Sequence, residues 1–247
     1  MATVAYLIKI AAREMGLATP FNVVATDYPP ETNQKLTNQL YAVCRELRAS
    51  RFFPQQKRTY SFNTSIGVSS YALPADFYSG LLGTQYDQST SLQLVGPVDD
   101  GQWNYLLYGA GGNPGLVQYR VFGPSLDQYA SAKMMQIYPT PTDVRTISYE
   151  YITRSFFYPA GWTPSTTVYE ELTADTDVCI FDEDIMISGL KYFYKEASNE
   201  EHEKDKNDFN RKLDNARSRW VGSIKGTFGV SRYGRRYGPP SLGNWSL

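Results

Sequence analysis

The single histidine is the first residue in this sequence to consider for catalysis or metal binding. His202 lies in the charged segment EEHEKDK, and the two cysteines, Cys44 and Cys179, stand far from it in the chain. A zinc site needs several such ligands, and a nucleophile–histidine pair would have to use this same charged position. The charged neighbours favour a solvated position in a helix. We therefore expect no metal site and no catalytic residue around His202.

A second group with chemical potential is a set of carboxylates that precedes an apolar helical pattern. It contains Asp175, Asp177, Asp182, Glu183 and Asp184. The group lacks the glycine and terminal glutamate spacing of an EF-hand calcium loop. Carboxylates directly ahead of a helix commonly cap its backbone N–H groups and interact favourably with its dipole. We interpret the group as capping residues, with cation binding as the alternative, and we expect no cofactor.

The glycine-rich segment GAGGNPG (109–115) invites comparison with loops that bind phosphate. In such loops a Lys-Ser or Lys-Thr pair follows the glycines and a helix begins there. Here the following segment is LVQYRVFG, whose alternation is typical of a strand. We therefore predict that 109–115 is the loop of a β-hairpin. No pair of carboxylates stands out as a glycosidase pair either.

The last 22 residues, 226–247, combine arginines and aromatic residues on a glycine-rich backbone. They contain five glycines, two prolines and no acidic residue, and they show neither helical nor strand periodicity. We predict an extended arm that binds another protein, because Tyr, Trp and Arg dominate the energetics of protein interfaces. Contact with nucleic acid and a terminus without function are the alternatives. The residues assigned to binding are Phe228, Arg232, Tyr233, Arg235, Arg236, Tyr237 and Trp245.

Helical periodicity occurs at both ends of the chain. Residues 3–16 and a second segment that begins after Pro30 each carry one apolar stripe, so residues 1–51 are expected to form an antiparallel helical pair. Residues 180–225 carry a further stripe with a polar middle, which predicts one long helix or two helices joined near residue 200. We expect these C-terminal helices to pack with the N-terminal pair as a bundle.

Between the helices the apolar residues alternate with polar ones. The clearest case is Ile147, Tyr149 and Tyr151, which are interleaved with Thr146, Ser148 and Glu150. Such alternation predicts half-buried antiparallel strands. Residues 52–179 are therefore expected to form a β-rich domain. The predicted fold class is α+β, with helices at both ends, a β-rich middle and the arm over 226–247.

The overall composition argues against a nucleic-acid-binding domain. The 24 basic and 25 acidic side chains give a net charge of −1, whereas such domains are normally strongly basic. Twenty tyrosines favour β structure and protein–protein contacts. No apolar run approaches the about 20 residues of a membrane span, and no signal peptide or disulfide framework is evident. We expect synthesis in a reducing cytoplasm and no membrane partner.

Two motifs resemble those of a known family. YALPADFY (71–78) and MMQIYPTPTDVRTISYEY (134–151) are similar to segments of the head-to-tail connector, or adaptor, proteins of short-tailed bacteriophages. The predicted order of elements agrees with that family along nearly the whole chain. One departure is the segment around 84–115, which we predict to be a peripheral hairpin that contacts tail proteins.

The resemblance implies a structural virion protein of the neck and tail, made in the host cytoplasm, and not an enzyme. It implies a homo-oligomeric ring, usually of twelve copies, that binds the portal protein, extends the DNA channel and carries tail nozzle or fibre proteins. By analogy the arm 226–247 would bind the portal. Double-stranded DNA would pass without specific binding, since tight phosphate contacts would hinder it. An acidic helical surface suits that channel, and its candidate residues are Glu200, Glu201, Glu203, Asp205 and Asp208.

Two other functions stay open from the sequence. One is a binding module associated with the tail or its fibres and built on the β-rich region. The other is an enzyme, for example a glycan hydrolase that uses two carboxylates. The ordinary charged, solvated face of a helix is likewise the alternative to a channel lining over 182–214.

Overall fold

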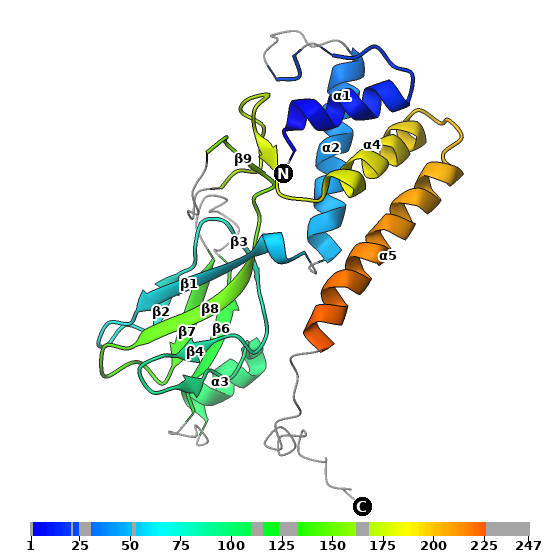
Figure 1. The fold of residues 1–247 in the computed structure, drawn as a ribbon. Coiled ribbons are helices and arrows are strands. Elements are labelled where there is room, and N and C mark those ends of the chain that lie inside the picture. Colours follow the sequence, from blue (N-terminus) through cyan, green and yellow to red (C-terminus); the bar gives the residue numbers. More distant parts are fainter. Residues whose placement is uncertain are drawn as a thin grey trace, which may run out of the picture.

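The structure is a computed structural model that describes residues 2–20, 22–24, 31–50, 53–109, 116–123, 133–161 and 168–225, with side chains described as far as residue 219. Helices gather at one end of the molecule and β sheets at the other (Figure 1). We call these two parts the helical body and the β body. The fold is mixed α and β with antiparallel sheets, as the sequence predicts.

The helical body contains four helices: α1 (Val4–Glu14), α2 (Glu31–Ser50), α4 (Glu183–Ala197) and α5 (Glu203–Lys225). The predicted C-terminal stripe is thus two helices, joined by residues 198–202. The expected antiparallel pairing of α1 with α2 is wrong: α1 lies across α2, and both pack on α4 far more than on each other (Figure 1). The reason is that α4 presents apolar side chains around most of its circumference and so receives α1, α2 and α5.

A glycine at the centre of α4 allows three helices to meet. A Cβ atom on Gly189 would lie 2.8 Å from Cγ1 of Val43 in α2 and 3.1 Å from Cε2 of Phe209 in α5. Any larger side chain would push one of these helices away. Gly189 therefore sets how closely α2 and α5 approach α4.

The β body consists of two antiparallel sheets that share one apolar core. Alternate residues of β8, namely Ile147, Tyr149 and Tyr151, are buried in that core, which confirms the predicted alternation. One sheet contains β1 (Lys57–Asn63), β3 (Phe77–Gly80), β4 (Tyr86–Asp87), β5 (Leu92–Gln93) and β8 (Thr146–Thr153), and the other contains β2 (Ser70–Ala72), β6 (Gln118–Phe122) and β7 (Met134–Tyr138). A separate short ribbon pairs β9 (Phe157–Tyr158) with β10 (Val178–Cys179) beside the helical body, and a 3-10 turn, η1, covers Pro54–Gln56.

The two sequence motifs of the family resemblance meet at a buried carboxylate. Asp76, from the first motif, is 1% exposed and follows the corner at which the chain passes from β2 in one sheet to β3 in the other. Its two carboxylate oxygens accept hydrogen bonds from the hydroxyls of Tyr151, at 2.7 Å, and Thr153, at 2.8 Å. Burial, and the hydrogen bond to Asp76, raise the pKa of Tyr151, so its hydroxyl remains a donor. The motifs thus encode this corner.

The region predicted to be purely β contains a helix that the sequence analysis missed. The segment 84–115 is not a long hairpin: the short hairpin of β4 and β5 is followed by α3 (Asp100–Tyr108). Asp99 caps this helix by accepting a hydrogen bond from the backbone N–H of Gln102 at 2.7 Å. Gly109 ends it, so the segment 109–115 lies between a helix and β6 and is not a hairpin loop. Residues 110–115 lie outside the described part of the chain.

The two cysteines come together in the helical body although they are far apart in the sequence. Cys44 lies on α2, and Cys179 lies on the short strand β10. Both are buried free thiols. Burial, followed by contact with Cys179, raises the pKa of Cys44 well above its usual value. The Cys44 thiol is therefore protonated and unreactive at neutral pH.

Replacing Gly189 tests the close approach of the three helices. Helix propensity alone would favour alanine by about 1 kcal/mol at this position. Because the added Cβ meets Val43 and Phe209, we expect Gly189→Ala to lower the free energy of unfolding by about 1–3 kcal/mol instead. Urea unfolding measures the difference. Gly123→Ala is the control, since a Cβ there meets nothing within 4 Å; a stabilising effect of Gly189→Ala would contradict the packing.

Removing the Asp76 carboxylate tests whether this group stabilises the corner between β2 and β3. Asp76→Ala leaves the hydroxyls of Tyr151 and Thr153 buried without their acceptor, so we expect the free energy of unfolding to fall by about 3 kcal/mol. Asp100→Ala is the matched control because its side chain is 90% exposed, and its effect should stay within about 1 kcal/mol. Equal effects for the two variants would count against a structural role for Asp76.

Candidate interaction surfaces

The residues assigned to the binding arm lie outside the described part of the chain. They are Phe228, Arg232, Tyr233, Arg235, Arg236, Tyr237 and Trp245. The helix that precedes the predicted arm, α5, ends at Lys225. Among the described side chains of α5, the last buried one is Ala216, and Arg217, Ser218 and Arg219 are exposed. The final turns of α5 thus lead away from α4 toward the start of the arm.

The five candidate channel residues do not form one uniform acidic face. Glu200 and Glu201 lie in the connection before α5, Glu203 lies in its first turn, and all three are exposed. Asp205 and Asp208 are at least partly buried and are neutralised by basic side chains. The structure brings the first three together at one end of the helical body and separates Asp205 from them.

Asp205 is part of an ion-pair cluster between α4 and α5. Its side chain is 11% exposed and accepts a hydrogen bond from Nζ of Lys195 at 2.6 Å. Nζ of Lys191 lies 3.5 Å from the other carboxylate oxygen and also 3.0 Å from the carboxylate of Glu14 on α1. Burial works to raise the pKa of Asp205, but the two lysines outweigh it, and the pKa is lowered. Asp205 therefore ties α5 to α4 and, through Lys191, to α1.

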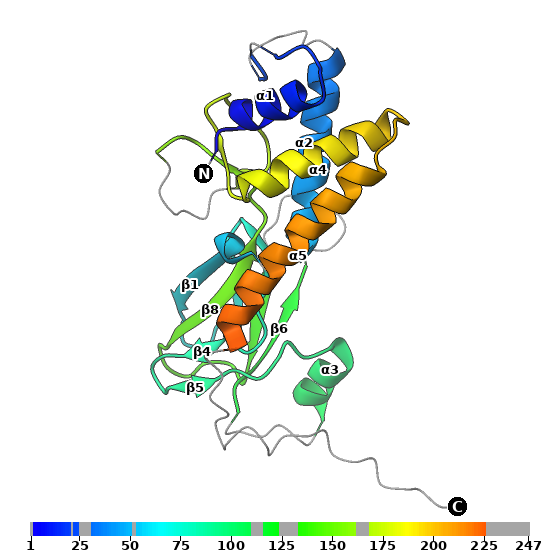
Figure 2. The same ribbon diagram turned by 45° about the vertical axis from the view of Figure 1, so that its right-hand side comes forward.

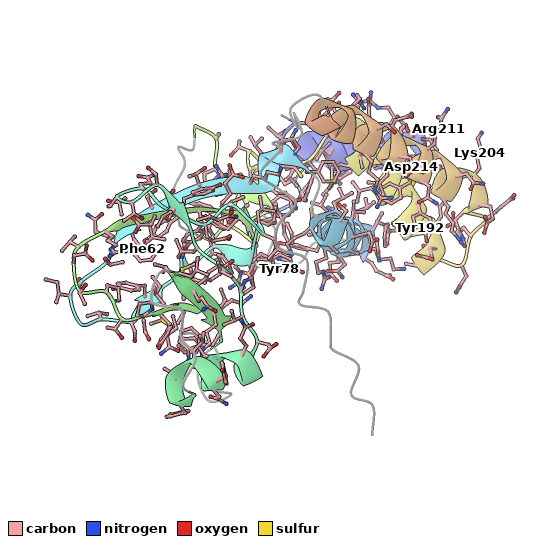
Figure 3. All side chains as sticks on the ribbon, turned by 90° about the horizontal axis from the view of Figure 1, so that it is seen from below. Phe62, Tyr78, Tyr192, Lys204, Arg211 and Asp214 are labelled. Carbon is pink, nitrogen blue, oxygen red and sulfur yellow. The ribbon has the colours of Figure 1, made fainter. Side chains whose placement is uncertain are left out.

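The negative charge of Asp208 is balanced by basic side chains of the same helix, α5. Its carboxylate binds the guanidinium of Arg211 and lies 3.1 Å from Nζ of Lys212. Burial works to raise the pKa of Asp208, and the two basic side chains lower it overall. Arg211 lies with Lys204 and Asp214 along the outer side of α5 (Figure 3). This side of the helix mixes both signs of charge.

His202 caps the start of α5 instead of standing inside a helix as predicted. Its backbone carbonyl accepts the hydrogen bond of the Lys206 N–H at 2.9 Å, and its ring lies 5.8 Å from the ring of Tyr192. The chain turns between α4 and α5 immediately before this residue, which is why the helical pattern is interrupted there. Within the described ranges, no group of three or more His, Cys, Asp or Glu side chains is placed to hold a metal ion.

The acidic group ahead of α4 divides into two kinds of contact. Asp182 caps α4, as predicted, by accepting a hydrogen bond from the Asp184 N–H at 3.1 Å. Asp175 instead binds the backbone N–H groups of Val23 and Val24, at 3.0 and 2.8 Å. Asp177 accepts hydrogen bonds from the backbone N–H groups of residues 173 and 174. The last two carboxylates therefore fix loops.

An arginine at the junction of the two bodies was not identified from the sequence. The Arg48 guanidinium, on α2, lies 4.5 Å from the ring centroid of Tyr78 in β3 and 2.8 Å from the carboxylate of Glu170. Arg154 binds the other oxygen of Glu170 at 2.6 Å. Burial works to raise the pKa of Glu170, and the two arginines outweigh it, so this pKa is lowered. Figure 3 shows Tyr78 between the sheets and α2.

The exposed apolar side chains of the β body include one set on two neighbouring loops and another on α3. Ile66, Val68 and Val144 lie on neighbouring loops, since the backbone of residue 67 bonds to that of residue 141. A second set lies on α3 and contains Tyr105, Leu107 and Tyr108, the last of which is 85% exposed. Exposed apolar groups of this kind mark surfaces that bind other proteins. No described helix is long and apolar enough to span a membrane.

These features define the class of the molecule. The charged and aromatic clusters of the described residues hold elements together, and the exposed apolar side chains offer surfaces for protein contact. The molecule has a mixed α and β fold. The model of the SU10 adaptor protein family matches residues 2–230, so the chain belongs to that family of phage adaptor proteins. This confirms the resemblance to phage adaptors and supports a structural role in the virion neck, while a comparison with curated proteins finds no match.

The ion pair of Asp205 predicts a specific dependence of stability on pH. Because its pKa is lower in the folded than in the unfolded state, ionised Asp205 stabilises the fold at neutral pH, and this contribution is lost as the pH falls below about 4. We expect Asp205→Asn to lower the free energy of unfolding at pH 7. The difference in free energy of unfolding between this variant and the wild type should disappear at acidic pH. Urea unfolding at a series of pH values checks this.

Asp214→Asn is the control for that series. Asp214 pairs with Arg217 on the same helix, but its side chain is 70% exposed. The substitution should therefore change the free energy of unfolding by about 0.5 kcal/mol or less at every pH. If the difference in free energy of unfolding between Asp205→Asn and the wild type does not change with pH, the carboxylate charge of Asp205 does not contribute to stability.

Proposed function

We propose that this protein is the subunit of a homo-oligomeric adaptor ring, of twelve copies, that joins the portal to the tail of a phage. The observation that carries the proposal is the family match over residues 2–230. The ring extends the DNA channel below the portal and offers a platform to tail nozzle or fibre proteins. Its function is mechanical, and its subunits need no catalytic residue and no cofactor.

The arm 226–247 binds the portal in this proposal. Its arginines and aromatic residues supply charged and stacking contacts, and its glycines let the backbone follow a groove. Lys225 lies about 14 Å beyond Ala216 along α5, at 1.5 Å per residue. The arm thus starts at a distance from the last described buried contact of the helix. That position supports a role in reaching a neighbouring molecule.

The channel lining is formed by the acidic end of the helical body. Glu200, Glu201 and Glu203 are exposed there, and Asp208 is partly exposed beside them. Asp205 is removed from this set, because it is buried and bound to two lysines. An acidic wall allows double-stranded DNA to pass without the phosphate contacts that would hold it.

The two ends of the subunit have separate roles. Residues 1–51 and 180–225 form the helical domain that faces the portal side, and residues 52–179 form the β-rich domain that meets the tail. The junction of Arg48 with Tyr78 and Glu170 supports this division, because it holds the two bodies at a fixed angle. The apolar residues at the far loops of the β body, Ile66, Val68 and Val144, supply the contact with tail proteins.

Truncation after Lys225 tests the proposal. We expect the truncated chain to lose binding to purified portal rings, as seen by electron microscopy of the mixture, because the arm supplies the contacts. Its thermal unfolding should match that of the full chain. A second variant carries the same 22 residues in a scrambled order, which keeps the charge and length, and it should bind portal as poorly as the truncated chain. Undiminished binding by the truncated chain would refute the role of the arm.

A further inference from the structure

The strand β1 ends the five-stranded sheet and has a β neighbour on one side only. Its seven residues pair with β8. The N–H of Lys57 closes the 3-10 turn η1 by binding the carbonyl of Pro54, and beyond it no other backbone group on the outer edge of β1 bonds to a described residue. Figure 2 shows β1 at the margin of the β body, beyond β8. The open edge is about 23 Å long at 3.3 Å per residue.

The hydrogen bonds of β8 show which residues of β1 face this edge. The carbonyls of Thr146 and Glu150 accept hydrogen bonds from Gln88 and Leu81, on the side away from β1. Backbone groups alternate in direction along a strand, so the odd-numbered residues of β8 bond to β1. Their partners in the register are Arg58, Tyr60 and Phe62. The residues whose backbone groups point outward are therefore Lys57, Thr59, Ser61 and Asn63.

This edge lacks the features that usually protect an open strand. Native proteins place proline, charged residues, a bulge or a covering element there. The charged residues of β1, Lys57 and Arg58, lie at one end, and from Thr59 to Asn63 the strand has no proline, glycine or charge. Its register with β8 continues without a bulge. The edge can therefore accept a further strand.

The core side of β1 is incompletely covered at the same edge. Tyr60 and Phe62 are only partly buried, whereas Tyr149, which lies opposite Tyr60 on β8, is 1% exposed. The ring of Tyr60 lies 5.8 Å from that of Tyr149 and 6.3 Å from that of Phe62. Aromatic pairs across strands stabilise a sheet. A further strand with an aromatic side chain opposite Tyr60 would extend this row of rings.

The length of the edge favours a second copy of β1 as the occupant. Among the described strands at the ends of the two sheets, β2 has three residues, β5 has two and β6 has five. The outer edge of β6 is also partly covered, because Val95 and Val98 bond to its backbone or to that of the preceding residue. Only β1 matches the seven-residue edge over its whole length.

Antiparallel pairing of two β1 strands about a twofold axis at Tyr60 uses the entire edge. Thr59 then lies opposite Ser61 of the second copy, and Lys57 lies opposite Asn63. The two copies exchange about six hydrogen bonds, at two for each complete pair. The two Tyr60 side chains face each other, and no like charges lie directly opposite, which would destabilise the pair.

We propose that two copies of the free protein pair through β1, so that their five-stranded sheets become one continuous sheet. A twofold contact does not relate neighbours in a ring of twelve, so the pairing belongs to the protein before ring assembly. It goes beyond the proposed adaptor function and does not depend on it. Because a single strand pair is smaller than a standard interface, the dimer should be weak, with a Kd on the order of 100 µM.

The first test uses proline on the two sides of β1. Ser61→Pro removes an outward N–H and none that bonds to β8, a position at which edge strands tolerate proline. Each dimer loses two hydrogen bonds, so we expect the Kd from sedimentation to rise roughly tenfold or more. Tyr60→Pro is the matched control: it removes an N–H that faces β8 and should lower the free energy of unfolding instead.

The second test uses charge on exposed side chains. Thr59 and Ser61 are exposed, so replacing both by Lys, or both by Glu, should preserve the fold. In a dimer each variant places like charges opposite one another, and each alone should be monomeric up to about 1 mM. An equal mixture of the two should form heterodimers. Asn210→Lys with Asn215→Lys, on the exposed side of α5, adds the same charge and should leave the dimer intact.

The outcomes decide between the possible occupants of the edge. Wild-type protein that sediments as a monomer at about 1 mM overturns the proposal. Dimers that persist in both like-charge variants also overturn it, because they use another surface. If the wild type is monomeric and Ser61→Pro prevents tail proteins from attaching to portal-bound rings, a strand of a tail protein occupies the edge, and the proposal is wrong.

Portal binding separates this contact from the adaptor function. The variant with two lysines should bind portal rings as the wild type does, because it carries the whole arm. Heterodimers of the Lys and Glu variants together with a loss of portal binding by the wild type lacking its arm support both proposals. Heterodimers without any portal binding by the wild type support the strand pairing and refute the adaptor function.

Discussion

The buried carboxylate of Asp76 is the interaction on which the β body depends. A charge in an apolar interior is tolerated only when hydrogen bonds satisfy it, and here the hydroxyls of Tyr151 and Thr153 do so. Both donors lie at the end of β8, from which the chain continues to Phe156 and Phe157 in the core of the helical body. One buried group thus fixes the corner between the sheets and the strand that leads to the helices.

The connection between the two bodies is equally constrained. Arg48 of α2 packs on the ring of Tyr78 and shares Glu170 with Arg154, so a helix, a strand and a loop meet at one guanidinium. In the helical body, Gly189 lets α2 and α5 approach α4, and Asp205 binds two lysines of α4. These contacts use different chemistry for the same purpose, which is to keep the elements from rotating relative to one another.

Periodic patterns in the sequence predicted the elements that bury one face. The stripes of α1 and α2 and the alternation in β8 correspond to buried residues, because a single face of each element meets the core. α3 was missed since it is nine residues long and exposes apolar as well as polar side chains, which hides the helical period. The contact of Cys44 with Cys179 and the ion pair of Arg48 with Glu170 could not be predicted, because each joins residues more than one hundred positions apart.

The acidic residues show the same limit. The sequence analysis assigned five acidic residues to one helical surface, but the sequence does not show which of them face α4. They are Glu200, Glu201, Glu203, Asp205 and Asp208. Asp205 lies four residues before the buried Phe209 and therefore on the inner side of α5, where lysines of α4 reach it. The arm was predicted from its composition alone, and no periodicity predicts how such a segment binds.

The length of α5 has a mechanical consequence. From Ala216, its last described buried residue, to Lys225 the helix spans about 14 Å at 1.5 Å per residue. A tilt of about 10° around Ala216 would move the far end by about 2 Å. The end of α5 therefore moves more than the part that packs on α4, and a displacement of this end is transmitted along the helix to that contact.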